Sequence, residues 1–331
     1  MAPTTLGGLK PALYMLSVLG TYHTWGRTVL DGSLSHLLTA LHGSKPYLLP
    51  GTESPLRTRI TGIYWPIDYL LDVLIVFFWE AVDGSHPATS AVGIYFLAQY
   101  FSVLTGVYVD SLRLGQSGKT TPARLVLGFL LPAVAMALPS PGLVSNDFQQ
   151  LALVAWNIFP VLVYLTMQVL HALLPAGTVN KEDATRRAIR ILNATSLLIS
   201  FAVHVSLMSI SFTTILFPNL WTPETIHEFH PVSLLIPPVS VTATQTVGDG
   251  VHSFFLWDQV FGYTLGILVA WLQLRTVLIA RDWYRQWPWP KVLLGIVGGA
   301  MIAGPGSVCL GLNWIRDEVL MPSAEVSQKE E

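Results

Sequence analysis

Four carboxylic acids lie inside stretches of the chain that are otherwise apolar, and they are Asp68, Asp72, Glu80 and Asp258. No Lys or Arg falls near the middle of any of these stretches. A carboxylate without a basic partner is expensive to bury as an ion, so such a group tends to stay protonated. A buried neutral acid can donate a proton to a substrate, which makes these residues the first candidates for chemistry.

Two of the acids each follow a tryptophan, as Trp79-Glu80 in "LIVFFWEAVDGSHP" and Trp257-Asp258 in "HSFFLWDQVFGY". The charge pattern described below predicts that both lie close to the same, lumenal, membrane surface. We therefore predict a paired acid centre, in which one acid donates the proton and the other holds or later receives it. The alternatives are that Glu80 caps a helix end in solvent and that the tryptophans are interface anchors.

Asp68 and Asp72 stand four residues apart and so share one helix face. By helix rise they lie roughly 12 to 18 Å from Glu80. We expect them, with Trp65 and Trp156, to be weaker candidates for lining the same substrate cavity. The alternative is that the two aspartates hydrogen-bond to neighbouring helices.

Several metal and cofactor motifs are missing. "DYLLD" at 68–72 has no second Asp-rich partner, which argues against a metal–diphosphate site. "HEFH" at 227–230 lacks the spacing of a helical zinc pair, and Cys309 is the single cysteine. We interpret His171 and His204 as packing residues. The sequence predicts no metal and no cofactor.

The composition is typical of a multi-pass membrane protein. Of 331 residues, 52% are hydrophobic and 11% charged, against about 25% charged in soluble domains. The net charge of −2 does not suggest a nucleic acid partner. We predict an all-α integral membrane protein, a bundle of seven transmembrane helices, or eight if the short stretch 11–22 crosses rather than forming a half-helix or interfacial helix. The predicted spans are 62–81, 90–109, 123–139, 150–173, 190–213, 255–279 and 290–311.

Basic residues alternate strictly between successive loops, which is a strong indicator of sidedness. The loops near 85 and 145 and the long loop 214–254 carry no Lys or Arg and are predicted to be lumenal. The N-terminal segment 1–61 is predicted to hold a short apolar helix and a cytosolic loop, 24–61, and its N-terminus is lumenal if 11–22 crosses and cytosolic if it does not. The bundle is expected over 62–311 and a polar tail over 312–331. "NAT" at 193–195 matches a glycosylation acceptor by chance, because it falls inside a span.

From about residue 60 to 311, the layout and the two acid motifs resemble the fungal membrane-bound terpene cyclases of meroterpenoid pathways, in particular the ascofuranone/ascochlorin (AscI-type) cyclases. The resemblance implies a multi-pass enzyme of the endoplasmic reticulum acting on an epoxidised farnesyl chain attached to an aromatic or polyketide head. It implies that a carboxylic acid, Glu80 or Asp258, protonates the epoxide without metal or redox cofactor. Trp79 and Trp257 would then stabilise the carbocation by cation–π attraction, about 2 kcal/mol or more when desolvated.

A heptahelical transporter or receptor is the rival interpretation, because proton-coupled transporters also need membrane acids. Such transporters usually show repeated halves or broken helices. No internal symmetry is visible, although Pro160 interrupts one span. The expected partners are a lipophilic prenylated substrate, membrane lipid and pathway enzymes at the same membrane.

Overall fold

The computed structural model describes residues 6–43, 46–114, 121–137, 142, 144–174 and 181–320. Within these residues all regular structure is helical apart from one isolated bridge between Leu48 and Pro55, as the all-α prediction requires. Three helices are long and apolar enough to cross a membrane, or four if one bent pair counts as a span. A complete set of seven or eight crossings stays a prediction.

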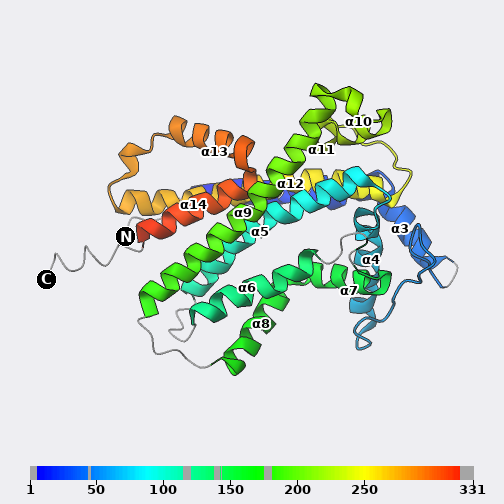
Figure 1. Ribbon diagram of the computed structural model, residues 1–331, viewed down its shortest axis with the longest axis horizontal. Helices are drawn as coiled ribbons and strands as arrows, with labels where there is room; N and C mark the ends of the chain where they lie inside the picture. The colour runs from blue at the N-terminus through cyan, green and yellow to red at the C-terminus, as the bar shows by residue number, and fades with distance from the viewer. Residues whose placement is uncertain are drawn as a thin grey trace.

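Four helices form the centre of the molecule (Figure 1): α5 (Pro87–Leu114), α9 (Lys181–Leu216), α12 (Val247–Ala280) and α14 (Pro305–Leu320). Small polar side chains join three of them. The hydroxyl of Ser200 on α9 lies 2.8 Å from that of Ser102 on α5 and 2.7 Å from that of Ser307 on α14. Small residues let helices approach closely inside a membrane. The outward faces carry exposed large apolar side chains, among them Leu198, Phe212 and Leu216 of α9.

The predicted span 290–311 does not cross the bundle, because the chain reverses inside it. Helix α13 (Trp289–Ala303) ends at Gly304, whose φ of 90° is a conformation that favours glycine, and α14 then runs back (Figure 1). The reversal lies against the middle of α5. Gln99 Oε1 there accepts hydrogen bonds from the free N–H groups of Gly306 and Ser307, at 2.9 Å and 3.3 Å. The two helices therefore form a hairpin that reaches halfway along α5.

Helix α14 also corrects the predicted polar tail, because it continues to Leu320 rather than ending at 311. It brings Arg316 into the core, where the residue is 5% exposed. Arg316 donates to Asp110 of α5, to Asp317 and to Gln273 of α12. Asp110 thus has a basic partner that the predicted span boundaries had excluded.

The predicted span 150–173 is bent. Helices α7 (Asn146–Asn157) and α8 (Phe159–Leu173) meet at Ile158 with an angle of 88° between them. Pro160, in the first turn of α8, has no N–H to continue a helix from α7. Helix α6 (Pro122–Ala137) packs against α8 and α9.

The stretch 11–22 belongs to a much longer helical run. Helix α1 (Leu6–Thr21), a π-helical turn (Tyr22–Gly26) and α2 (Arg27–Leu30) follow one another without a break, over about 37 Å. The run lies antiparallel to α12, since Gly20 faces Phe261, His23 stacks on Trp257 and Ser33 faces Gly250. Helix α1 is not among the candidate membrane spans of the described residues, so a crossing by 11–22 stays a prediction.

Helix α4 (Trp65–Val82) lies across the end of the bundle rather than along it (Figure 1). Among the described residues, the ring contacts of α4 with α12 come from Phe77 and Phe78, near the C-terminal end of α4. The hydrogen bond between Glu80 and α12 also lies at this end. The predicted span 62–81 is not among the candidate membrane spans of the described residues. The helix carries three acids, Asp68, Asp72 and Glu80, which makes it a poor membrane span.

The segment 24–61 lies beside the loops that were predicted to be lumenal, so this segment and those loops cannot lie on opposite sides of a membrane as predicted. Trp79 donates to the carbonyl of Pro50, and Asn146 donates to Ser54. Arg27 donates to the carbonyls of Val239 and Ser240. The long helical run 6–30 carries the chain to this end of the molecule. The charges of Arg57 and Arg59 gave no reason to expect this.

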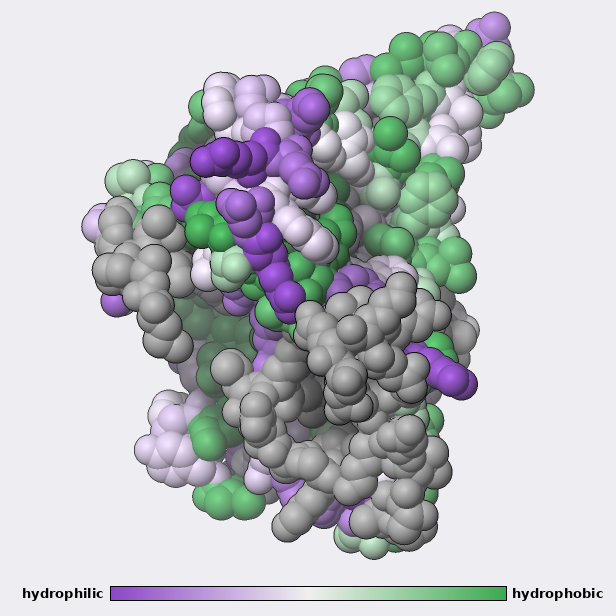
Figure 2. Space-filling view, turned by 90° about the vertical axis from the view of Figure 1, so that its left-hand side faces the viewer, coloured by the Kyte–Doolittle hydropathy of each residue, from purple (hydrophilic) through white to green (hydrophobic). Residues whose placement is uncertain are grey.

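The opposite end of the molecule faces the viewer in Figure 2, and hydrophilic side chains gather on it. Exposed Arg281 and Arg285 follow the end of α12 there. The short helices complete the fold: α3 (Ser33–His42), the 3-10 turns Pro218–Leu220 and Tyr284–Gln286, α10 (Pro223–Phe229) and α11 (Pro231–Leu235).

Candidate active site

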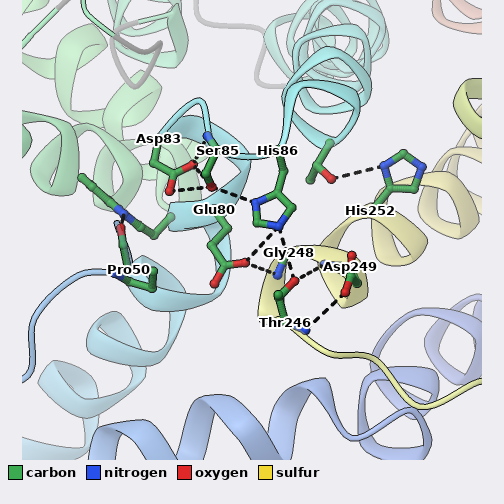
Figure 3. Close-up of polar contacts among 11 residues, drawn as sticks. Pro50, Glu80, Asp83, Ser85, His86, Thr246, Gly248, Asp249 and His252 are labelled. Atoms are coloured by element: carbon green, nitrogen blue, oxygen red, sulfur yellow. Dashed lines mark hydrogen bonds and ion pairs between the residues drawn. The ribbon is translucent and has the colours of Figure 1, made fainter. Parts of the chain in front are cut away.

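Glu80 lies in the last turn of α4, at the point where the chain reverses into α5. Helix α4 ends at Val82, and Gly84 takes a φ of 84°, which lets the chain turn back sharply to Pro87. This turn brings His86 over Glu80 (Figure 3). Glu80 is only 6% exposed. A buried carboxyl group is thus held beside a loop that reaches the surface.

The carboxyl oxygen Oε2 of Glu80 accepts a hydrogen bond of 2.6 Å from the backbone N–H of Gly248. Gly248 is the second residue of α12, where N–H groups lack partners within the helix and the helix dipole favours negative charge. Thr246 caps the same helix end through a reciprocal pair with Asp249. Glu80 is therefore a helix cap, but one that is buried and supplied by another helix, not the solvated cap of its own helix considered above.

Gly248 is the residue that allows this approach. A Cβ at this position would lie 2.5 Å from Glu80 Oε2 and 3.0 Å from two atoms of the His86 ring. No side chain fits there without displacing one of them. The backbone at Gly248 thus fixes both side chains.

A chain of polar groups leads from Glu80 towards the surface (Figure 3). His86 Nε2 lies 3.7 Å from Glu80 Oε2 and 3.4 Å from the hydroxyl of Thr246. The other ring nitrogen of His86, Nδ1, is 2.8 Å from the hydroxyl of Ser85. That hydroxyl in turn lies 2.7 and 2.9 Å from the two carboxyl oxygens of Asp83.

Tyr47 belongs to the same neighbourhood, from the segment before α4. Burial, and in second place the nearby Glu80 charge, raises the pKa of the Tyr47 hydroxyl. The phenol is half-buried. The segment 46–57 therefore contributes a neutral hydroxyl group to the surroundings of Glu80.

An aromatic cluster packs between α4, α7 and α12 on the Glu80 side of the bundle. The ring of Phe78 lies 5.3 Å from Trp156, 5.7 Å from Phe255 and 6.2 Å from Phe254. Phe77 contacts Phe254 at 5.3 Å. Trp156 was predicted as a pocket residue, and the structure brings it to the helix that carries Glu80.

Asp258 lies elsewhere on α12 and does not meet Glu80. The helix starts at Val247, well before the predicted span, so Asp258 is about three turns inside it. It stands ten residues beyond Gly248, the contact of Glu80, or about 15 Å by helix rise. The predicted direct pair is therefore wrong. Asp258 instead lies close to the Tyr100 hydroxyl, with which it interacts electrostatically, and this hydroxyl lies over Gly262.

The two tryptophans beside these acids serve packing. Trp79 is fully buried and donates from Nε1 to the Pro50 carbonyl at 3.0 Å, which ties the segment 46–57 to α4. Trp257 donates to the Pro238 carbonyl at 3.2 Å and stacks on His23 with ring centroids 4.2 Å apart. Arg27 lies over the Trp257 ring, 5.4 Å from its centroid. This ring already faces a cation of the protein itself.

The remaining predicted residues lie away from Glu80. Trp65 is 73% exposed and stacks on Tyr69. Asp68 accepts hydrogen bonds from the N–H groups of Thr61 and Gly62, which orders the turn before α4. Oδ1 of Asp72 is buried and makes no hydrogen bond with any described residue. Asp68 therefore has a structural role, whereas Asp72 lacks, among the described residues, the hydrogen bonds to neighbouring helices that the alternative interpretation required.

His86, Gly248 and Tyr100 are the site residues that sequence reasoning missed. His86 stood in the quoted motif, two residues after a glycine that signals a turn, and that spacing could have indicated its return to Glu80. Gly248 and Tyr100 carried no local signal. By contrast, His204 is the satisfied packing residue predicted: it contacts the Tyr95 hydroxyl and the Met301 carbonyl at 3.1 and 3.0 Å.

In the part of the chain that the structure describes, no three His, Cys, Asp or Glu side chains gather where they could hold a metal ion. The His pair of "HEFH" conforms to this, since His230 caps α11 by accepting from the Val232 N–H. The acceptor motif at 193–195 is also buried, with Asn193 only 1% exposed. His230 therefore has a structural role, and Asn193 is too buried to be reached from solvent.

Comparison with known proteins identifies the family. A model of the CtvD domain matches residues 9–125 and 116–321. Among curated relatives, the terpene cyclase penA of Penicillium crustosum is 24% identical over 92% of this chain and 95% of its own. The terpene cyclase ctvD of Aspergillus terreus is 23% identical over 91% and 97%. The terpene cyclase ascI of Acremonium egyptiacum is 22% identical over 89% and 83%. No solved structure matches the chain. The chain therefore belongs to the CtvD-domain family, together with these fungal terpene cyclases.

Proposed function

We propose that this chain is an integral membrane terpene cyclase that protonates the epoxide of a farnesylated aromatic or polyketide substrate. The relatives support the class of enzyme. The observation that supports this reaction is the buried Glu80 carboxyl group, one oxygen of which accepts a hydrogen bond at the start of α12. An acid in this position can be aimed at a substrate while the protein excludes water.

Glu80 is the proton donor in this proposal. The contacts of Glu80 with Gly248 and His86 both use Oε2. In our proposal Oε1 is therefore the oxygen that donates its proton to the epoxide. Transfer of its proton to the epoxide oxygen opens the ring, leaves a hydroxyl group and places a positive charge on carbon. The Gly248 N–H stabilises the carboxylate that remains.

The aromatic cluster beside Glu80 supports the cationic steps. The rings of Phe78, Phe254, Phe255 and Trp156 come from three helices and are held by one another. Aromatic faces attract a carbocation by about 2 kcal/mol or more when water is excluded. These rings replace Trp79 and Trp257 as the cation-stabilising groups of our proposal, since both tryptophans are engaged elsewhere.

Asp258 and Tyr100 form a second polar site in this proposal. A linear prenyl chain aligned with α12 has its epoxide at one end and its head group at the other. With the epoxide at Glu80, the Asp258–Tyr100 pair faces the far part of the chain or the polar head. There it accepts the proton lost at termination or binds the head-group hydroxyl. Uptake and release of one proton make the overall reaction an isomerisation, which requires neither metal nor redox cofactor.

The first experiment is incubation of membranes carrying the protein with an epoxyfarnesyl phenol, analysed by liquid chromatography and mass spectrometry. We expect a cyclised product of unchanged mass from wild type, with and without the chelator EDTA. Glu80→Gln keeps the shape of the side chain and removes its acidity, so the product should be lost. Glu53→Gln, in an exposed part of the segment 46–57, is the matched control and should retain turnover.

Two outcomes would contradict the proposal. Near-wild-type turnover by well-folded Glu80→Gln would remove the proton-donor role. Absence of product from wild type across several epoxyfarnesyl substrates would favour the transporter or receptor alternative, which uptake of the same compounds into vesicles would then test. Fractionation against an endoplasmic reticulum marker tests the proposed location.

A further inference from the structure

His86 connects Glu80 with the surface. Its side chain is 27% exposed, whereas that of Glu80 is 8% exposed. The Nε2 atom faces Glu80 Oε2 at 3.7 Å, and the rest of the ring extends towards Ser85 (Figure 3). A proton that Glu80 gives to a substrate must be replaced before the next turnover. The ring of His86 reaches both the buried acid and solvent.

The hydrogen bonds around His86 determine which ring nitrogen carries the resting proton. As a carboxylate, Asp83 only accepts, and the Ser85 hydroxyl lies within 2.9 Å of both its oxygens. The single hydroxyl proton of Ser85 is therefore directed to Asp83. Ser85 then accepts from His86, so Nδ1 carries the hydrogen at 2.8 Å. This leaves Nε2, the nitrogen facing Glu80, free to gain and lose a proton.

We propose that His86 returns the proton to Glu80 after each turnover, with Asp83 and Ser85 holding its ring in the required tautomer. This inference rests on the proposed function of Glu80 as an acid. His86 Nε2 takes up a proton from a hydronium ion of the bulk solvent, which releases a water molecule, and forms an imidazolium; this balances the proton released to solvent at termination. The N–H bond then breaks towards Glu80 Oε2, a new O–H bond forms there, and Nε2 regains its lone pair. Rotation of the carboxyl group about its Cγ–Cδ bond then turns this O–H towards the substrate, and the deprotonated oxygen takes its place beside Gly248. His86 acts through Glu80, so it is a positioning and relay residue.

The separation of 3.7 Å between His86 Nε2 and Glu80 Oε2 suits such an intermittent transfer. It exceeds a direct hydrogen bond, so the proton passes through one bridging water or after a small side-chain shift. Gly248 keeps both groups within reach, because any Cβ there would collide with them. Thr246, 3.4 Å from Nε2, supports the ring from the α12 side.

Other titratable groups surround the relay from each packed element. They are Asp83 after α4, Asp249 and His252 on α12, and Tyr47 in the segment before α4. Asp249 is held by Thr246, and His252 by the hydroxyl of Thr89 and the carbonyl of Ser233. Neither is in contact with Glu80 in these hydrogen bonds. His252 therefore provides a matched control histidine on the same helix end.

The test measures proton delivery without substrate. Full-length protein in detergent is subjected to a light-triggered pH drop, and the carbonyl band of protonated Glu80 is followed by time-resolved infrared spectroscopy. The band is assigned by its absence in Glu80→Gln. We expect His86→Gln to slow its appearance by at least about tenfold. Added imidazole should restore the rate in His86→Ala. His252→Gln should leave the rate unchanged.

The proposal is overturned if the band of Glu80 forms at the wild-type rate in His86→Gln, or if wild type shows no such band at any pH at which it stays folded. If His86 variants do not fold, Asp83→Asn and Ser85→Ala replace them. Each substitution removes a hydrogen bond that keeps the proton on His86 Nδ1, so each should slow the appearance of the Glu80 band. Wild-type rates in both variants would refute the relay. Failure of the cyclase is recognised separately, since a working relay with no cyclised product would contradict only the proposed reaction.

Discussion

Gly248→Ala tests the geometry of the site with one methyl group. The new Cβ would lie 2.5 Å from Glu80 Oε2, and ordinary contacts begin at 3.4 Å, so the carboxyl must retreat by at least about 0.9 Å. The hydrogen bond from the Gly248 N–H is 2.6 Å long, and this retreat takes it to the limit of hydrogen-bond range. The same methyl group presses on the His86 ring at 3.0 Å.

The magnitude follows from the bond that is lost. A hydrogen bond to a charged group contributes about 1.5 to 3 kcal/mol. If it stabilises the carboxylate left after proton transfer, turnover should fall by about 10- to 100-fold, at about 1.4 kcal/mol per tenfold. The net cost in stability should be about 0.5 to 2 kcal/mol, because alanine exceeds glycine in helix propensity by about 1 kcal/mol and offsets part of the lost hydrogen bond.

The assay is initial-rate cyclisation at saturating substrate, with thermal unfolding measured on the same preparation. Gly295→Ala is the control, because a Cβ at that position on α13 meets nothing within 4 Å. Wild-type turnover in a folded Gly248→Ala variant would refute the reasoning. Loss of turnover together with a large drop in the unfolding midpoint would show that the substitution acts through the fold instead.

Three further predictions follow from single contacts. Tyr100→Phe removes the hydroxyl beside Asp258 and should alter the ratio of cyclised products or lower turnover, while Glu80 protonation in the infrared assay stays normal; an unchanged product profile would count against the second polar site. Arg316→Met removes the buried cation that pairs with Asp110 and should cost about 3 to 5 kcal/mol of stability, seen as a lower unfolding midpoint in detergent; an unchanged midpoint would contradict it. Trp65→Ala should leave turnover close to wild type because that side chain is 73% exposed, and a large loss would return Trp65 to the site.

The chain's composition and motifs were enough to predict an all-α protein with long apolar helices, and the resemblance of two short motifs was enough to indicate its family. Glu80 could be singled out because an acid after a long apolar run is rare and costly. Apolar length alone could not say where helices break. The reversal at Gly304 depends on Gln99 of another helix, and the bend at Ile158 separates two helices within one apolar run.

The tertiary structure alone decided which acids have which neighbours. The start of α12 lies well before its apolar stretch, because Thr246, Asp249 and Glu80 cap it with polar groups that hydropathy reads as loop. That shift moves Asp258 away from Glu80 and brings Gly248 to it. His86 became visible only once the turn at Gly84 was known. Sequence determines which groups can be buried, whereas contacts between distant segments determine what each buried group meets, and these contacts leave no local pattern.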